Sequence, residues 1–187
     1  MLKTSASPTA RTSTFVQKAK PSLSGIWNNC RGEAPGRQHH QHTWRRITVR
    51  VFNEQTLDML RNAGWSEHRY VPLYDFIKNS PILFPLARSI LIQFDGLQIG
   101  TSGAGVDCAA SDIKFDSWPV YDSASEMEEL CAANGKLFCP LGYCHCDHGL
   151  VVIDEEGKVF TFYDSLRLMG SSFEEGIQNI LDGRSPR

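Results

Sequence analysis

The stretch KLFCPLGYCHCDHGLVVIDEEGKVFTFY, residues 136–163, decides the fold. Apolar runs rich in β-branched and aromatic residues occupy 136–142, 149–154 and 158–163, and runs of this kind predict strands. The tetrapeptide DEEG at 154–157 joins the last two runs and is typical of a tight hairpin. The stretch therefore predicts three consecutive strands, the last two of which form an antiparallel hairpin.

Helix signals flank these strands. Ser172 and Glu175 have capping-box spacing, as do Ser123 and Glu126, and Gly183 is placed to end the last helix. Apolar spacing also predicts helices over 53–65, 71–80 and 85–96, short strands over 47–52, 97–100 and 111–116, and a loop at 101–105. Helices followed by strands with hairpins predict an α+β single domain, with a mostly antiparallel or mixed sheet flanked by short helices.

Two sets of aromatic and apolar residues are predicted to pack inside this domain. The helix at 71–80 takes its apolar side from Tyr74, Phe76 and Ile77. Three further residues, Trp65, Phe94 and Leu97, are predicted to lie in the core because large apolar side chains dominate the energetics of packing.

The first fifty residues differ in charge from the rest. They carry nine Lys or Arg and one Glu, a formal charge of +8, whereas residues 51–187 carry ten Lys or Arg and twenty Asp or Glu, a charge of −10. We expect a disordered basic tail, rich in Ser, Thr, Pro and His, at 1–46 and a folded domain at 47–187. Three interpretations of the tail stay open: a solvated tail, sequence upstream of the true start, or a targeting or nucleic-acid-binding arm.

The densest group of reactive side chains follows the first of the three strands. Cys144, Cys146 and His148 alternate, so in an extended chain Cys144 and His148 would lie about 13 Å apart. The ligands of a tetrahedral zinc ion lie within roughly 4 Å of each other, so a zinc site requires a turn here and a fourth ligand such as Cys139. These four residues are weak metal candidates, and the favoured interpretation is a polar loop without metal or cofactor.

Enzyme and membrane motifs are not found in the sequence. There is no phosphate-binding glycine loop, nucleophile elbow or zinc-protease motif, and Cys139 stands in an apolar context where a thiol is usually unreactive. No apolar run approaches the length of a membrane-spanning helix, which is about 20 residues. Six cysteines without an export signal are interpreted as mostly reduced thiols. We therefore expect a cytoplasmic protein without catalytic residues.

The stretch LDMLRNAGWSEHRYVPLYDFI, residues 57–77, resembles the opening of the SUKH-3 family of immunity proteins, in the SMI1/KNR4-like SUKH superfamily. Ala63, Gly64, Trp65 and Arg69 stand where that family has the Ala-Gly-Trp end of its first helix and a following arginine. Further similar segments are FDGLQI at 94–99, the strand and hairpin at 136–160, and IQNILDG at 177–183. The resemblance covers about residues 47–184. The basic segment before it and the thiol-rich loop at 144–148 depart from the family pattern.

The resemblance implies a non-enzymatic protein that binds and neutralises a toxin, often a nuclease, and it assigns no contact residues. A domain of charge −10 suits a basic protein partner and argues against nucleic-acid binding by the domain itself. Aromatic side chains among acids are plausible binding anchors. The predicted partner-binding residues are Asp107, Asp112, Asp116, Trp118, Tyr121, Asp122, Glu126, Glu128 and Glu129.

Alternatives remain open at this stage. Trp118 and Tyr121 can instead pack in the core, which would leave the acids as solvated surface. The same fold can serve an adaptor or regulatory module with an ordinary cellular partner. A third alternative, a small zinc or thiol protein, would use residues 139–148.

Overall fold

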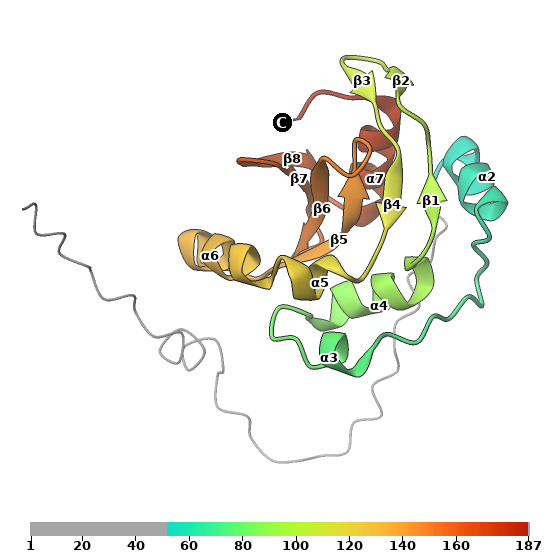
Figure 1. The fold of residues 1–187 in the computed structure, drawn as a ribbon. Helices are drawn as coiled ribbons and strands as arrows, with labels where there is room; N and C mark the ends of the chain where they lie inside the picture. Colours follow the sequence, from blue (N-terminus) through green and yellow to red (C-terminus); the bar gives the residue numbers. More distant parts are fainter. Residues whose placement is uncertain (1–51, 187) are drawn as a thin grey trace, which may run out of the picture. The chain divides into compact units, whose positions relative to one another are not determined.

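An antiparallel six-stranded sheet organises residues 52–186, the part of the chain that the computed structural model describes (Figure 1). The strand order is β1-β4-β5-β6-β7-β8, and β2 and β3 form a separate two-stranded ribbon. The strands are β1 (Gln98–Ile99), β2 (Gly103–Ala104), β3 (Ala109–Ala110), β4 (Ile113–Phe115), β5 (Phe138–Cys144), β6 (Gly149–Asp154), β7 (Val159–Phe162) and β8 (Leu166–Gly170). The predicted α+β class with a mostly antiparallel sheet is confirmed. The predicted tail at 1–46 and residues 47–51 of the predicted first strand lie outside the described residues.

Six helices accompany the sheet within residues 52–186: α2 (Glu54–Asn62), α3 (Asp75–Lys78), α4 (Pro85–Phe94), α5 (Pro119–Asp122), α6 (Ala124–Asn134) and α7 (Phe173–Asp182). The ends of α7 follow the predicted signals. The Ser172 side chain accepts a hydrogen bond from the Glu175 amide at 3.2 Å, and Gly183 takes the left-handed conformation with φ of 63°. These contacts satisfy backbone groups that a helix end leaves without partners.

One predicted helix start is wrong and one predicted side-chain cap does not form, each because another contact takes the backbone. The helix predicted over 71–80 begins only at Asp75, since the Val71 amide donates to the Ile92 carbonyl at 2.8 Å and joins this segment to α4. Ser123 precedes α6 but makes no side-chain cap. Its own amide donates to the Pro119 carbonyl, because α5 ends there, so it lacks the extended conformation that an N-cap needs.

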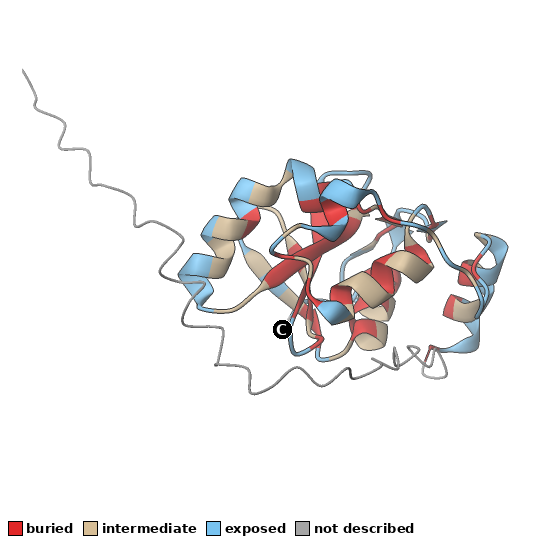
Figure 2. Ribbon diagram, turned by 90° about the horizontal axis from the view of Figure 1, so that it is seen from below, coloured by how far each residue is buried: buried red, intermediate tan, exposed pale blue. Residues whose placement is uncertain are grey.

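The core lies between the sheet and its helices. Figure 2 shows the buried residues concentrated along the strands and on the inner sides of the helices. The rings of Phe115 and Phe173 each lie 5.2 Å from the ring of Phe94, and Trp65 stacks on Phe94 at 6.2 Å. Trp65, Phe94 and Leu97 are all buried, which confirms the predicted core residues.

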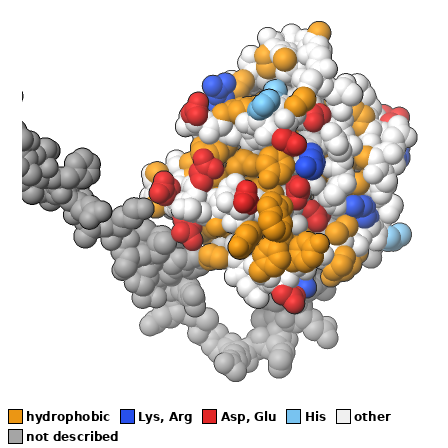
Figure 3. Space-filling model, in the orientation of Figure 1, with side chains coloured by type: hydrophobic (Ala, Val, Ile, Leu, Met, Phe, Trp, Pro, Cys, Tyr) orange, Lys and Arg blue, Asp and Glu red, His pale blue; other side chains and the backbone are white. Residues whose placement is uncertain are grey.

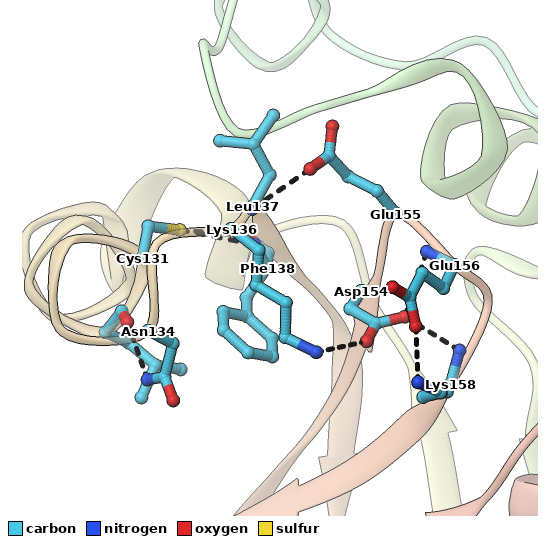
Figure 4. A network of polar contacts seen from close by, with 10 residues as sticks. Cys131, Asn134, Lys136, Leu137, Phe138, Asp154, Glu155, Glu156 and Lys158 are labelled. Atoms are coloured by element: carbon cyan, nitrogen blue, oxygen red, sulfur yellow. Dashed lines mark hydrogen bonds and ion pairs between the residues drawn. The ribbon is translucent and has the colours of Figure 1, made fainter. Parts of the chain in front are cut away.

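The β6–β7 hairpin is held by a buried carboxylate (Figure 4). Asp154 is fully buried and accepts hydrogen bonds from Lys136 Nζ at 2.6 Å and from the amides of Glu156 and Lys158 at 3.0 and 2.9 Å. One side chain therefore joins the turn at 154–157 to the start of β5. A buried charge that is paired and hydrogen-bonded in this way has its loss of hydration offset.

Candidate partner-binding surface

Four exposed aromatic side chains contact one another on α3 and α5 and on the residues that precede these helices. Tyr74, Phe76, Trp118 and Tyr121 are 66%, 45%, 46% and 59% exposed. The Phe76 ring is central: its centroid lies 5.5 Å from that of Tyr74, 6.0 Å from Trp118 and 5.2 Å from Tyr121. We call these four residues the aromatic face. Clustered exposed aromatic residues are uncommon on surfaces that face only water and are enriched where proteins bind partners.

Each short helix buries only one or two residues, Ile77 in α3 and Pro119 with Val120 in α5, and its other side chains face outward. Ile77 in α3 and Val120 in α5 are inside the core, and the two helices contact each other. A helix of four residues makes about one turn, so it has room for little more than one inward-facing position. The prediction that Tyr74 and Phe76 belong to the apolar packing side of their helix is therefore wrong. Trp118 and Tyr121 do not enter the core either.

Carboxylates lie next to the aromatic face (Figure 3). The figure shows hydrophobic side chains gathered together with acidic ones around them. Asp116 precedes α5 and accepts a hydrogen bond from the Trp118 amide at 2.9 Å, while Asp122 ends α5 and is exposed. Asp75 lies between Tyr74 and Phe76 in sequence and pairs with Lys78 at 3.0 Å.

A hollow of 260 Å³ lies beside this surface, lined in part by Glu126, Tyr143, Asp147 and Tyr163. We call it the Tyr143 hollow. Burial and the nearby carboxylates of Asp116, Asp122 and Asp147 raise the pKa of the Tyr143 phenol. Three of the predicted partner-binding residues, Asp116, Asp122 and Glu126, therefore lie near Tyr143, a residue that was not predicted to take part.

The other four predicted acids lie elsewhere in the domain, and two of them accept hydrogen bonds from backbone amides. Asp112 is buried, and its Oδ1 accepts a hydrogen bond from the Cys146 amide at 3.0 Å. Asp107 stands between β2 and β3 and accepts from the Ser185 amide at 3.1 Å. Glu128 and Glu129 lie farther along α6. The structure thus gathers only part of the predicted set, around Trp118, Tyr121 and the start of α6.

The thiol-rich loop folds into a tight turn. His145, Cys146 and Asp147 have consecutive positive φ angles of 53°, 54° and 66°, a conformation that costs energy for residues other than glycine. Two hydrogen bonds from the residues that precede β4 stabilise this turn. The Ser111 hydroxyl accepts from the His145 amide at 2.8 Å, and the Asp112 carboxylate accepts from the Cys146 amide. The turn is therefore defined by residues far away in the sequence.

The cysteines differ in environment. Cys139 and Cys144 are buried, and burial raises the pKa of both thiols, that of Cys144 to about 11. Cys146 is exposed and lies 3.4 Å from the Ser102 hydroxyl. A thiol with a raised pKa is a poor nucleophile because the thiolate is the reactive form. The five cysteines of the described region, Cys108, Cys131, Cys139, Cys144 and Cys146, are free thiols.

In residues 52–186, no group of three or more His, Cys, Asp or Glu side chains is placed to hold a metal ion. Of the helices described there, none has the length and apolar character needed to cross a bilayer.

Comparison with known proteins gives one match. The model of the family described as SUKH-3 immunity protein matches residues 52–183. Searches among curated proteins and among solved structures returned no match. The matched residues include the sheet, its helices and the aromatic face, and they confirm the family expected from the segments at 57–77, 94–99, 136–160 and 177–183.

Proposed function

Because this chain belongs to the SUKH-3 immunity protein family, we propose that it binds a toxin domain and neutralises it by forming a stoichiometric complex. No bond is made or broken in this role. The complex forms in the cytoplasm, and the free thiols of the described region suit that reducing compartment. The toxin carries a basic surface, as nucleases do.

The aromatic face is the observation that carries the proposal. Protein interfaces derive most of their binding energy from a few aromatic and arginine side chains near the centre of the contact. Phe76 lies at the centre of the aromatic face, with Tyr74, Trp118 and Tyr121 around it, so it is suited to the centre of such a contact. Rings that already contact one another lose little freedom when a partner covers them, which favours binding.

Charge supports the same surface. Residues 51–187 carry a formal charge of −10, and Asp116 and Asp122 stand next to the aromatic face. Complementary charges accelerate the encounter with a basic partner and disfavour partners of the wrong charge. The aromatic face then supplies affinity, and the carboxylates supply rate and selectivity.

The test first examines the neighbouring genes for a toxin domain and then pairs that domain with this protein. Growth of cells that express the toxin measures neutralisation, and calorimetry with the catalytically inactivated toxin measures binding. The full chain should restore growth and bind at equimolar ratio. The double variant W118A/Y121A should lose at least about 100-fold in affinity, since hot-spot truncations cost roughly 2 kcal/mol or more each.

A matched control separates this surface from exposed aromatics in general. Tyr70 is 69% exposed, and its ring makes no contact with the aromatic face among the described ring pairs. The variant Y70A should bind and protect like the unsubstituted chain. Binding without protection would contradict the neutralising role, and equal losses in Y70A and W118A/Y121A would contradict the assignment of the face.

A further inference from the structure

The Tyr143 hollow and the aromatic face are linked by carboxylates that act on both. Asp116 accepts from the Trp118 amide and also acts electrostatically on Tyr143, as does Asp122 at the end of α5. The same carboxylates therefore lie next to the aromatic face and also act on Tyr143, which lines the hollow.

The chain's own Lys114 shows what chemistry this surface accepts. Its ammonium lies 5.3 Å from the centroid of the Tyr143 ring, 3.7 Å from Asp116 and 4.0 Å from Asp147. A cation above an aromatic ring and between carboxylates is stabilised by both. Tyr143 thus already has one cationic neighbour, held by the contacts that a partner's cation would use.

The chain's own cations do not neutralise the surroundings of Tyr143. Asp116, Asp122, Glu126 and Asp147 carry four formal negative charges around Tyr143 and the hollow, whereas Lys114 and Arg167 carry two positive ones. Arg167 lies 5.9 Å from the centroid of the Tyr163 ring, which also lines the hollow. No side-chain hydrogen bond or ion pair within residues 52–186 engages the carboxylate of Asp122 or of Glu126. A net formal charge of −2 beside exposed aromatic rings fits a positively charged side chain.

We propose that an arginine of the toxin inserts into the Tyr143 hollow, beside Glu126 and against the Tyr143 ring, with Asp122 close enough to act on the same site, while the toxin surface around it covers the aromatic face. The planar guanidinium stacks on rings and donates paired hydrogen bonds to carboxylates, which lysine cannot do equally well. The inference rests on the proposed function and specifies the chemistry of its partner: a basic surface with at least one protruding arginine.

The first experiment removes charge without removing shape. The double variant D122N/E126Q and the control E54Q/D58N each lose two exposed carboxylates, the control on α2. Binding of the inactivated toxin is measured by surface plasmon resonance between about 0.05 and 0.5 M NaCl. D122N/E126Q should weaken binding about 10-fold or more at low salt and flatten the salt dependence, because hydrogen bonds to charged groups are lost. The control should change affinity by less than about threefold.

The second experiment uses a defined probe. N-acetyl-arginine methylamide is titrated into the full chain with isotope-labelled tyrosine, with N-acetyl-citrulline methylamide plus matched NaCl as the uncharged comparison. The Tyr143 ring signals, assigned by their loss in Y143F, should move with the arginine probe alone, and D122N/E126Q should abolish the movement.

The outcomes distinguish this inference from the proposed function. If the full chain binds and neutralises the toxin but D122N/E126Q behaves like E54Q/D58N, the arginine site is wrong and the proposed function stands. Equal shifts with arginine and citrulline, or none with either, overturn the arginine site as well. If the full chain neither binds nor protects, the proposed function itself fails.

Discussion

Replacing Asp154 by alanine should be among the most damaging single changes outside the apolar core. The carboxylate is fully buried, and it accepts hydrogen bonds from Lys136 Nζ and from the amides of Glu156 and Lys158. Hydrogen bonds to charged groups contribute about 1.5–3 kcal/mol each. Because the two amides belong to a surface turn and regain water in part, the three bonds do not add in full. We expect D154A to lower the free energy of unfolding by about 3–5 kcal/mol, the range for breaking a buried pair.

Two further variants divide that loss between charge and geometry. D154N keeps an oxygen that can accept from the turn amides and leaves Lys136, whose side chain is 32% exposed, able to reach water. It should cost roughly 1–2 kcal/mol. K136M keeps the apolar packing near Phe138 and Phe160, where the ammonium lies 5.1 and 5.3 Å from the ring centroids, but it leaves the buried carboxylate without its cation. Its cost should lie between those of D154N and D154A.

Urea unfolding followed by circular dichroism measures these differences, provided that the slope with urea is unchanged. The surface substitution E156Q, at a residue that pairs with Lys158, is the control and should cost less than about 0.5 kcal/mol. A loss below about 1 kcal/mol in D154A would refute the reasoning, because the turn amides and Lys136 would then have replaced the carboxylate with water at no cost. If D154N proved as damaging as D154A, the charge and not the turn geometry would be decisive.

Three further predictions concern β5 and the turn after it. Gly142 has φ of 144°, and a Cβ there would overlap the backbone of β4. In urea unfolding, G142A should therefore lower the free energy of unfolding by more than about 3 kcal/mol. The control G135A changes a glycine with φ of 67° and open space around it, and it should lower that free energy by only about 1 kcal/mol. In thiol titration near pH 8, Cys146 should react rapidly and Cys144, with its pKa raised to about 11, only after unfolding; fast reaction of Cys144 in C146S would contradict its burial. Burial lowers the pKa of His145 below 6.5, so its contribution to stability is full above that pH and is lost as the pH falls toward the folded-state pKa; melting temperatures measured from about pH 7.5 to 5.5 should fall less in H145Q, and parallel curves would contradict this.

Local signals made part of the fold predictable from the sequence. The turn at 154–157 joins two apolar runs, and Ser172 and Gly183 bound α7 where capping chemistry places them. These features depend on residues within a few positions of one another, so the backbone preferences that produce them can be recognised in the sequence. The family resemblance rested on such segments and on their order.

Elements held by distant contacts were not predictable. Helix α5 and strand β8 were missed: α5 has only four residues, and β8 shows no alternation between buried and exposed positions. The turn at His145 to Asp147 contains no glycine to announce its left-handed backbone, and its partners Ser111 and Asp112 lie 34 residues earlier. A pattern read along the chain carries no information on such contacts.

The candidate site was predicted in part, and the reason is geometric. Acids beside Trp118 and Tyr121 were visible in sequence, but Tyr74 and Phe76 were assigned to packing because apolar spacing normally marks the inner side of a helix. That rule assumes a helix long enough to have an inner side of several residues. In α3 the only buried residue is Ile77, so the other rings face outward.

The residues that attach α3 and α5 to the domain differ from the exposed rings proposed to bind the partner. Ile77 and Val120 hold α3 and α5 on the domain, whereas the aromatic face contributes mainly contacts between exposed rings, worth about 0.5–1.5 kcal/mol per pair. W118A/Y121A removes three such pairs and should therefore lower the free energy of unfolding by about 1.5–4.5 kcal/mol, a loss that still leaves a domain of ordinary stability folded. Substitutions on the face can then change the partner without changing the core. A larger loss of stability would mean that these rings support the fold, and lost toxin binding would no longer identify a contact surface.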